Sequence, residues 1–140
     1  MKLSQKAEYA MRAMLELAIR SGQSKAARTA DIASNQQIPE KFLELILVEL
    51  RRAGLISSQR GPVGGHRLAR DAHEISVGDI WRAVEGSNNT RTEPRKGHID
   101  PFRAVWEDVD KAISGVVDRV SLAEIRKRAE AKRTVPDYSI

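Results

Sequence analysis

The sequence predicts a mainly α-helical fold with one small β-hairpin and a long helix near the C-terminus. Apolar residues recur at three- and four-residue steps in several segments, which is typical of helices that bury one face. Between residues 55 and 70, two short strand-like segments flank a glycine-rich stretch. Aromatic residues make up only 4% of the 140 residues, so we expect an aliphatic core in one globular domain.

The composition excludes several classes of site. The chain has no cysteine, which excludes a disulfide scaffold, a CxxC zinc site, a thiol nucleophile and a cysteine-ligated iron–sulfur cluster. A net charge of +5 favours an anionic partner such as nucleic acid or an acidic membrane surface. The sequence shows no signal peptide and no apolar run that approaches the roughly 18 residues of a bilayer span. We therefore expect a cytoplasmic protein without membrane contact.

Three helices are expected in the first half of the chain. The first runs from about Ser4 to Arg20 and the second from Thr29, whose hydroxyl is expected to cap it, to about Gln37. Pro39 is suited to the first turn of the third helix, because its missing amide would have no partner there. That helix is expected to end near Gly54. The residues expected to form the buried face of the first helix are Ala10, Met11, Met14, Leu15, Leu17 and Ala18.

The third helix has two distinct faces. Placing successive residues 100° apart gathers Leu43, Ile46, Leu47 and Leu50 on a face suited to the core. The opposite face carries Lys41, Glu44, Leu45 and Val48. That second face is more apolar than a merely solvated surface needs, which indicates contact with a partner.

The expected hairpin is basic. Its tip is Gly61-Pro62-Val63-Gly64-Gly65, and no acidic residue occurs between positions 51 and 70. The five arginines in that segment are Arg51, Arg52, Arg60, Arg67 and Arg70. A hairpin with solvated arginines is the alternative interpretation.

Three helices followed by a glycine-tipped basic hairpin is the order of a winged helix-turn-helix, in which the third helix enters the DNA major groove. Here Lys41 could donate to guanine, Glu44 could accept from cytosine N4 and Leu45 could contact a thymine methyl. Alternatively, Lys41 and Glu44 are simply solvated. The predicted DNA-binding residues are Thr29, Pro39, Lys41, Glu44, Leu45, Val48, Arg51, Arg52, Arg60, Gly64, Gly65, His66 and Arg67.

The second half begins with a capping box, Ser76 to Asp79, which opens a short helix that ends at Gly86. A polar, flexible loop is expected over 87–99, followed by a long helix from Asp100. A second capping box, Ser121 to Glu124, opens a short helix expected to dissolve into the basic run at 126–128. The predicted division is a DNA-binding domain at 1–86, the loop at 87–99, dimerisation helices at 100–133 and a tail at 134–140.

The long helix has more apolar surface than its neighbours in a small domain can cover. Part of it is therefore expected to pack on a second subunit, although burial within one chain is the alternative. The expected dimerisation residues are Phe102, Val105, Trp106, Val109, Ala112, Ile113 and Val116.

The runs Leu50–Leu55, Arg60–Arg70, Ile75–Ile80 and Ala83–Gly86 resemble the Rrf2 family of bacterial regulators, and the similarity extends to Glu124. The resemblance implies a homodimeric regulator, expected to be a repressor, on a palindromic operator in double-stranded DNA. It implies DNA contacts from Pro39, Lys41, Glu44, Leu45 and Arg60. Leu45 stands where many members have a polar base-reading side chain, so the operator sequence does not transfer.

The resemblance also defines the alternatives. One branch of the family acts through a complex with an enzyme, so an interaction module that controls a metabolic enzyme is the second hypothesis. A small-molecule or protein effector is compatible with either hypothesis. An enzyme is not expected, because the chain has no phosphate loop, no nucleophile elbow and only three scattered histidines.

The expected departure from the family is in its sensor. Cluster-binding members place three cysteines before the long helix, and this chain has none between Gly86 and Trp106. No cofactor is therefore expected. Glu8, which matches an acidic ligand of some relatives, could form an oxygen and nitrogen metal site with His98 and Asp100 across the dimer, but the His-x-Asp spacing is a weak signal. We expect all three to be ordinary surface residues.

Overall fold

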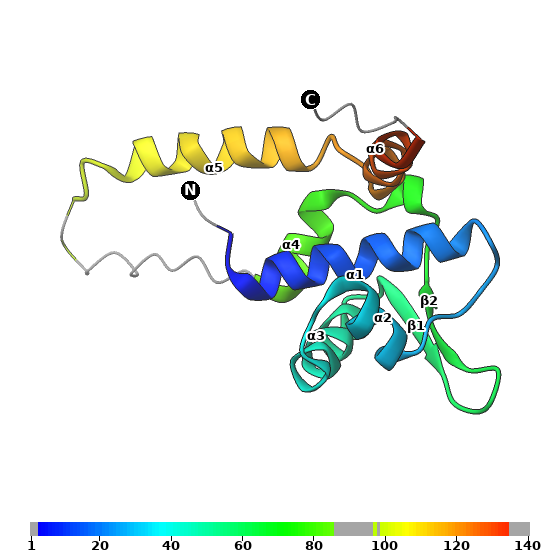
Figure 1. Cartoon of the computed structure of the whole chain (residues 1–140). Coiled ribbons are helices and arrows are strands. Elements are labelled where there is room, and N and C mark those ends of the chain that lie inside the picture. Colours follow the sequence, from blue (N-terminus) through cyan, green and yellow to red (C-terminus); the bar gives the residue numbers. More distant parts are fainter. Residues whose placement is uncertain (1–2, 86–96, 98, 135–140) are drawn as a thin grey trace, which may run out of the picture.

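The computed structural model describes residues 3–85, 97 and 99–134 of the chain, and its elements confirm the predicted fold class (Figure 1). The helices are α1 (Gln5–Ser21), α2 (Thr29–Gln36), α3 (Glu40–Arg52), α4 (Val77–Glu85), α5 (Arg103–Val117) and α6 (Leu122–Thr134), with a short 3-10 helix, η1 (Ala72–Glu74). Strands β1 (Ile56–Gln59) and β2 (Gly65–Leu68) form the hairpin. None of the helices in the described ranges has the length and apolar character that a bilayer span requires.

Helix α1 is the centre of the fold. Helices α2, α3, α4 and α6 and strand β2 all pack against it. Its buried face contains four alanines, Ala7, Ala10, Ala13 and Ala18, together with Met14, Glu16 and Leu17. Short side chains allow neighbouring backbones to approach closely, so one helix can hold five elements. The predicted face is confirmed for Ala10, Met14, Leu17 and Ala18, whereas Met11 and Leu15 are only half-buried.

Helix α3 buries the predicted core face, because Leu43, Ile46, Leu47 and Leu50 are all inside the protein. The expected place of Pro39 in the first helical turn is wrong. Its ψ of 127° is outside the helical region, and the helix begins at Glu40. Pro39 therefore fixes the chain direction just before the helix.

The expected capping of α2 by Thr29 is also wrong. Thr29 is the first helical residue, and the capping position belongs to Arg28, which forms no side-chain cap. The Thr29 hydroxyl instead bonds the ring of His66, 37 positions away in sequence, at 2.9 Å. A contact with so distant a residue has no local sequence signal.

The hairpin pairs Ile56 with Leu68 and Gln59 with Gly65 in antiparallel register. Its tip requires glycine at two positions. A Cβ on Gly64 would lie 2.2 Å from the Gln59 carbonyl oxygen, and Gly65 has a φ of +140°. His66 also exchanges both backbone hydrogen bonds with Ala27, so the hairpin is joined to the segment that leads into α2.

Helix α4 starts as predicted, with a complete capping box. The Ser76 hydroxyl accepts from the Asp79 amide at 3.0 Å, and the Asp79 carboxylate accepts from the Ser76 amide at 2.9 Å. The polar loop expected at 87–99 falls largely outside the described residues.

Helix α5 begins at Arg103 and not at Asp100, and helix α6 is longer than expected. No residue of α5 is buried, so the alternative of burial within one chain is wrong. Helix α6 does not dissolve into the basic run: it continues to Thr134 and is joined to the body by buried Leu122 and Ala123. Alanine, glutamate, lysine and arginine are all good helix formers, which explains the longer helix.

Candidate nucleic-acid interface

The exposed face of α3 presents the side chains that were predicted to contact bases. Lys41, Glu44 and Leu45 are exposed and Val48 is half-buried. Leu45 is 64% exposed although the other leucines of this helix are buried. A large apolar side chain held in water between two charged ones is available for contact with a partner.

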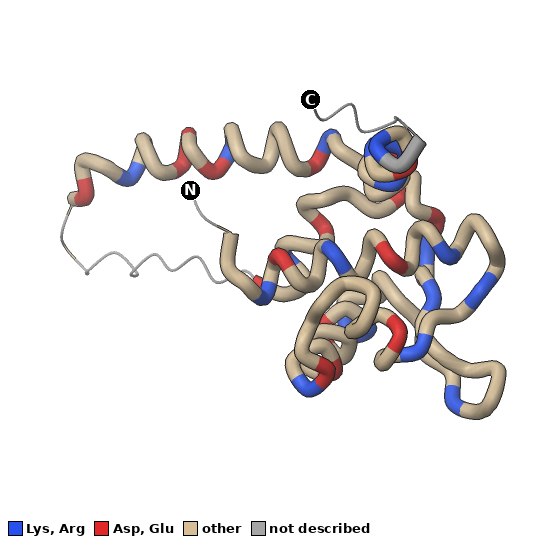
Figure 2. Tube along the Cα trace, in the orientation of Figure 1, with Lys and Arg blue, Asp and Glu red and all other residues tan. Residues whose placement is uncertain are grey.

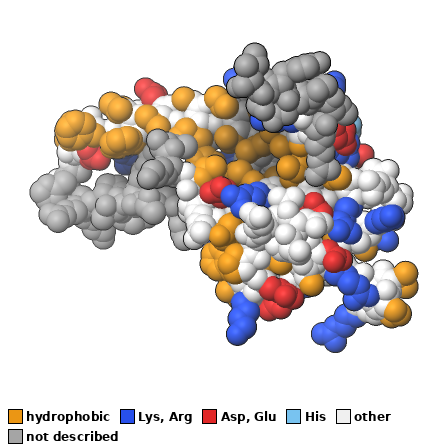
Figure 3. Space-filling model, viewed as in Figure 1, with side chains coloured by type: hydrophobic (Ala, Val, Ile, Leu, Met, Phe, Trp, Pro, Cys, Tyr) orange, Lys and Arg blue, Asp and Glu red, His pale blue; other side chains and the backbone are white. Residues whose placement is uncertain are grey.

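The hairpin and both ends of α3 lie on the side of the molecule away from α5 (Figures 1 and 2). In the space-filling view, Lys and Arg side chains project from this lower edge at α3 and at the hairpin, with acidic side chains between them (Figure 3). Arg51 and Arg52 are exposed at the C-terminal end of α3, and Arg60 and Arg67 are exposed on the hairpin. The arrangement can therefore meet a long anionic surface at separate points.

Arg28 is a residue of this surface that sequence reasoning missed. Its guanidinium donates to the carbonyl oxygens of Pro62 at 2.7 Å and Gly61 at 3.3 Å. These bonds tie the hairpin tip to the start of α2. The charge of Arg28, close to Lys25, was visible in the sequence, but its contact with a glycine-rich tip 33 positions away was not.

His66 lies inside the junction between the hairpin and α2. Its Nε2 is 2.9 Å from the Thr29 hydroxyl and its Nδ1 is 2.7 Å from the Ser58 hydroxyl. Both ring nitrogens therefore have partners within the protein. Burial, together with the nearby positive charge of Arg51, lowers the pKa of His66 below its ordinary value.

The remaining predicted residues of the hairpin have structural contacts as well. Arg67 donates to the Ser24 carbonyl oxygen at 3.3 Å while remaining exposed. Gly64 is buried and Gly65 is half-buried against the segment before α2. The structure thus brings Thr29, His66 and Gly65 together, whereas Pro39 and Lys41 lie on a different element.

A buried carboxylate joins α1 to α2, the helix that precedes α3. Glu16 of α1 is 7% exposed and accepts hydrogen bonds from Asn35 at 2.7 Å and Gln36 at 3.1 Å, both on α2, and from Arg20 at 3.3 Å. Burial raises the pKa of Glu16, but these donors outweigh it, so the pKa is below its ordinary value. Glu16 therefore fixes α2 against α1 as a carboxylate.

Two of the three candidate metal ligands, Glu8 and Asp100, have partners within the chain. Glu8 forms an ion pair with Arg12 at 2.6 Å, and the Asp100 carboxylate accepts from the Phe102 amide at 2.9 Å. His98 lies outside the described residues. Within the part of the chain that the structure describes, no group of three His, Cys, Asp or Glu side chains could hold a metal ion.

Comparisons with known proteins agree with this architecture. The chain is 37% identical over 135 residues to the HTH-type transcriptional regulator IscR of Vibrio campbellii, which covers 93% of this chain and 80% of the relative. It is 38% identical over 130 residues to IscR of Serratia proteamaculans, covering 89% of this chain and 79% of that protein.

Solved structures extend the likeness to the fold. The structure of T. potens IscR matches with a TM-score of 0.83 and 38% identity, over 99% of this chain and 95% of that one. CymR, described as the global cysteine regulator of B. subtilis, matches with a TM-score of 0.77 and 30% identity, over 91% of this chain and 98% of that one.

The family match covers most of the chain. Residues 3–128 match the family described as "Rrf2: Iron-dependent Transcriptional regulator". This range extends beyond the three helices and the hairpin to most of the chain. The relatives are named as transcriptional regulators and not as enzymes. The chain belongs to the Rrf2 family of transcriptional regulators.

Proposed function

We propose that the chain is a cytoplasmic, homodimeric and sequence-specific DNA-binding repressor. The observation that carries the proposal is the placement of the exposed face of α3 and the basic hairpin on one side, with the apolar arm α5 on the other (Figure 1). The first side suits DNA and the second suits a second copy of the chain. The units of the proposal are a DNA-binding domain at 1–86 and dimerisation helices at 100–133.

In the proposed complex, α3 enters the major groove with its first turns at the base edges. Lys41 donates to guanine, Glu44 accepts from cytosine and Leu45 contacts a thymine methyl. Arg51, Arg52 and Arg60 meet phosphates. Contacts to phosphate position the protein and contacts to bases select the sequence, so the two groups of residues have separable roles.

His66 and Thr29 have a supporting role in this proposal. Both ring nitrogens of His66 are engaged by Thr29 and Ser58, so the ring holds the hairpin on α2. Arg28 fixes the hairpin tip through Gly61 and Pro62. A hairpin held at two points keeps Arg60 at a constant position relative to α3.

The proposed dimer uses the apolar side of α5. Phe102 is 65% exposed, Val105 55% and Trp106 51%, and the set continues through Val109, Ala112, Ile113 and Val116. An apolar stripe of this length on one helix is a typical interface of a small dimer. Two copies joined this way would place their α3 helices in successive major grooves about 34 Å apart on a palindromic operator.

The residues do not fit the iron cofactor that the family description suggests. Iron–sulfur clusters are held by cysteine thiolates, and this sequence contains no cysteine. Glu8 and Asp100, the described candidates for oxygen ligands, have partners of their own. The proposed regulator therefore responds to a signal other than a cysteine-held cluster, such as a small-molecule or protein effector.

A DNA-binding experiment on the chain's own promoter region tests the proposal. We expect a salt-sensitive, sequence-preferring complex. Arg60→Ala should weaken all complexes alike and reduce the salt dependence by about one phosphate contact. Lys41→Ala should weaken the free energy of DNA binding by about 1–3 kcal/mol and relax the sequence preference at one base pair. In a reporter strain, the intact chain should lower transcription from this promoter.

Lys127→Ala is the matched control, because Lys127 is an exposed cation on α6, away from the proposed interface. Its DNA affinity should equal that of the unmodified chain. Binding that ignores sequence, or that is weakened equally by Lys127→Ala and Arg60→Ala, would contradict the proposal.

A further inference from the structure

The segment between α5 and α6 is bonded to the start of α4. The Val77 amide donates to the Val120 carbonyl oxygen at 2.9 Å, and the Leu122 amide donates to the Ile75 carbonyl oxygen at 2.7 Å. These bonds form an antiparallel bridge between Ser76 and Ser121. Because Leu122 and Ala123 are also buried, the segment that links α5 to α6 is fixed at the start of α4. Helix α5, with the residues up to Asp118, is called the arm.

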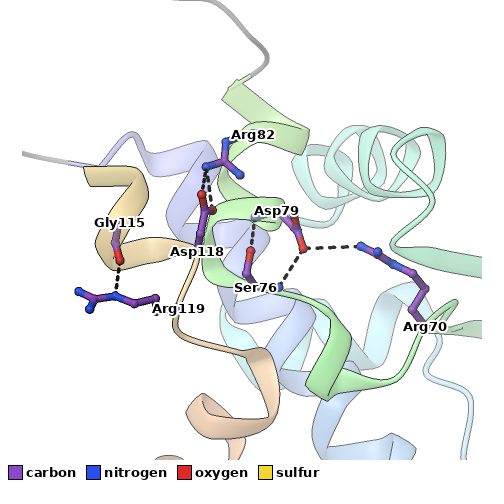
Figure 4. Close-up of polar contacts among 7 residues, drawn as sticks. All are labelled: Arg70, Ser76, Asp79, Arg82, Gly115, Asp118 and Arg119. Carbon is purple, nitrogen blue, oxygen red and sulfur yellow. Dashed lines mark hydrogen bonds and ion pairs between the residues drawn. The ribbon is translucent and has the colours of Figure 1, made fainter. Parts of the chain in front are cut away.

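One ion pair lies beside this segment and connects the C-terminal end of the arm to α4 (Figure 4). One guanidinium nitrogen of Arg82, Nη2, donates to both carboxylate oxygens of Asp118, each at 2.7 Å. These charge-assisted bonds hold the carboxylate close to α4. Arg119 closes the same end of α5 by donating to the Gly115 carbonyl oxygen.

The Asp118 carboxylate rests directly on Gly78. A Cβ at position 78 would lie 2.0 Å from Asp118 Oδ1 and 3.1 Å from Val117 Cγ2, so glycine is the residue that leaves room for the carboxylate. Gly78 itself belongs to the first turn of α4, which the Ser76 and Asp79 capping box fixes. The Asp118 side chain therefore lies against the first turn of α4.

The rest of α5 is not buried by the described part of its own chain. No residue of α5 is buried, and its packing on the body is mainly on α4. The pair formed by Arg103 and Glu107 joins two positions of the arm itself, at 3.1 Å. The contacts at its C-terminal end, at Asp118 and along the Ser76–Ser121 bridge, join α5 to α4.

We propose that the Arg82–Asp118 pair, in contact with Gly78, sets the angle between α5 and α4. This angle thereby determines which spacing of the two operator half-sites the dimer accepts. One base pair moves a half-site by about 3.4 Å along the duplex and about 35° around it, so a small change of arm angle misplaces the second α3. The consequence for DNA rests on the proposed function. The angle itself is a property of one chain.

The angle can be measured without DNA. The chain has no cysteine, so Ser34→Cys on α2 and Lys111→Cys on α5 introduce unique sites for spin labels at exposed positions. Labelled chains are diluted with unlabelled ones, and pulsed electron resonance measures the distance within one chain. We expect a narrow distance distribution in the otherwise unchanged protein and a broader or shifted one after Asp118→Asn, Arg82→Gln or Gly78→Ala.

Glu107→Gln is the matched control, because it removes an ion pair that lies within the arm. Its distribution should be unchanged. Gly78→Ala keeps both charges and adds only a methyl group to a helix. The protein should therefore stay folded while the Asp118 carboxylate is displaced. Identical distributions for Asp118→Asn, Gly78→Ala and the unchanged chain would overturn the proposed role of the pair.

A second experiment tests the consequence for DNA with operators whose half-sites are moved by one or two base pairs in either direction. The preference for the natural spacing should fall about fivefold in Asp118→Asn, the upper range for one exposed ion pair, with the dimer mass unchanged. A retained preference would overturn the effect on spacing. A chain that binds no DNA would defeat the proposed function, while the distances would still decide the role of the pair.

Discussion

Helices α3 and α5 have the same spacing of apolar residues, but the chain buries the apolar face of α3 and leaves that of α5 exposed. Helix α3 places Leu43, Ile46, Leu47 and Leu50 in the core, whereas no residue of α5 is buried. The difference arises from their neighbours. Helix α3 packs on α1, α2, α4 and β1, while α5 packs mainly on α4.

The comparison shows that periodicity predicts a helix with an apolar face but does not say what covers that face. For α3 the cover is the chain's own core, so mutations there should affect folding. For α5 we propose that the cover is a second copy, so mutations there should affect assembly. Two experiments separate these outcomes, and two more test the stability of the side of the molecule that carries α3.

The largest effect is expected in α3. Ile46→Ala should lower the free energy of unfolding by about 3 kcal/mol, because it removes buried methylenes and leaves a cavity. Leu45→Ala on the exposed face of the same helix should change that free energy by less than about 0.5 kcal/mol. Urea unfolding measures both. Similar losses in the two variants would mean that the two faces of α3 are not distinct.

The next effect is expected in α5. Val105→Asp should raise the dimer dissociation constant by about thirtyfold or more, equal to roughly 2 kcal/mol, because it places a charge in the proposed interface. Lys111→Ala, on the same helix, should leave the constant unchanged. Sedimentation velocity across a concentration series gives both values. A Val105→Asp chain that dimerises as tightly as the original would show that α5 is not the interface.

A smaller effect is expected between α1 and α2, at Glu16. Glu16→Gln should lower the free energy of unfolding at neutral pH by about 1–2 kcal/mol, since it replaces charge-assisted hydrogen bonds with neutral ones. Because the folded-state pKa of Glu16 is below 4.5, this stability is present above pH 4.5 and is lost as the pH falls through the folded-state value. The difference between the two proteins, followed by urea unfolding, should therefore shrink in acid. A constant difference would contradict the assignment.

The smallest effect is expected at His66 of strand β2. Its folded-state pKa is below 6.5, so the unfolded chain binds the proton more readily than the folded one. Stability should be complete above pH 6.5 and fall as the pH drops through the folded-state pKa. His66→Gln should lack this part of the pH dependence. Unfolding midpoints on both sides of pH 6.5 test it, and equal slopes would exclude His66 as the source.

Features within one helix or one turn of the chain could be predicted from the sequence. The buried face of α3 follows from spacing alone. The Ser76 and Asp79 box follows from two residues three positions apart, and both of its hydrogen bonds form. In each case the partners are neighbours along the chain, so the sequence contains the complete interaction.

Features that join distant segments could not be predicted in this way. Thr29 was expected to cap α2, yet its hydroxyl bonds His66, because the fold brings the hairpin to that hydroxyl. Arg28 and the Arg82–Asp118 pair were missed for the same reason. The length of α6 was underestimated because a run of basic residues is compatible with both a helix and a tail.

The alanine face of α1 has a mechanical consequence. With Ala7, Ala10, Ala13 and Ala18 in contact with the surrounding elements, little side-chain volume separates the helices, and closely packed interiors resist deformation. Helix α1 and the elements packed on it should therefore move as a single rigid body. A signal transmitted through α5 would then act at its C-terminal end, where Asp118 contacts Arg82 of α4, and the length of α5 would amplify a small rotation there.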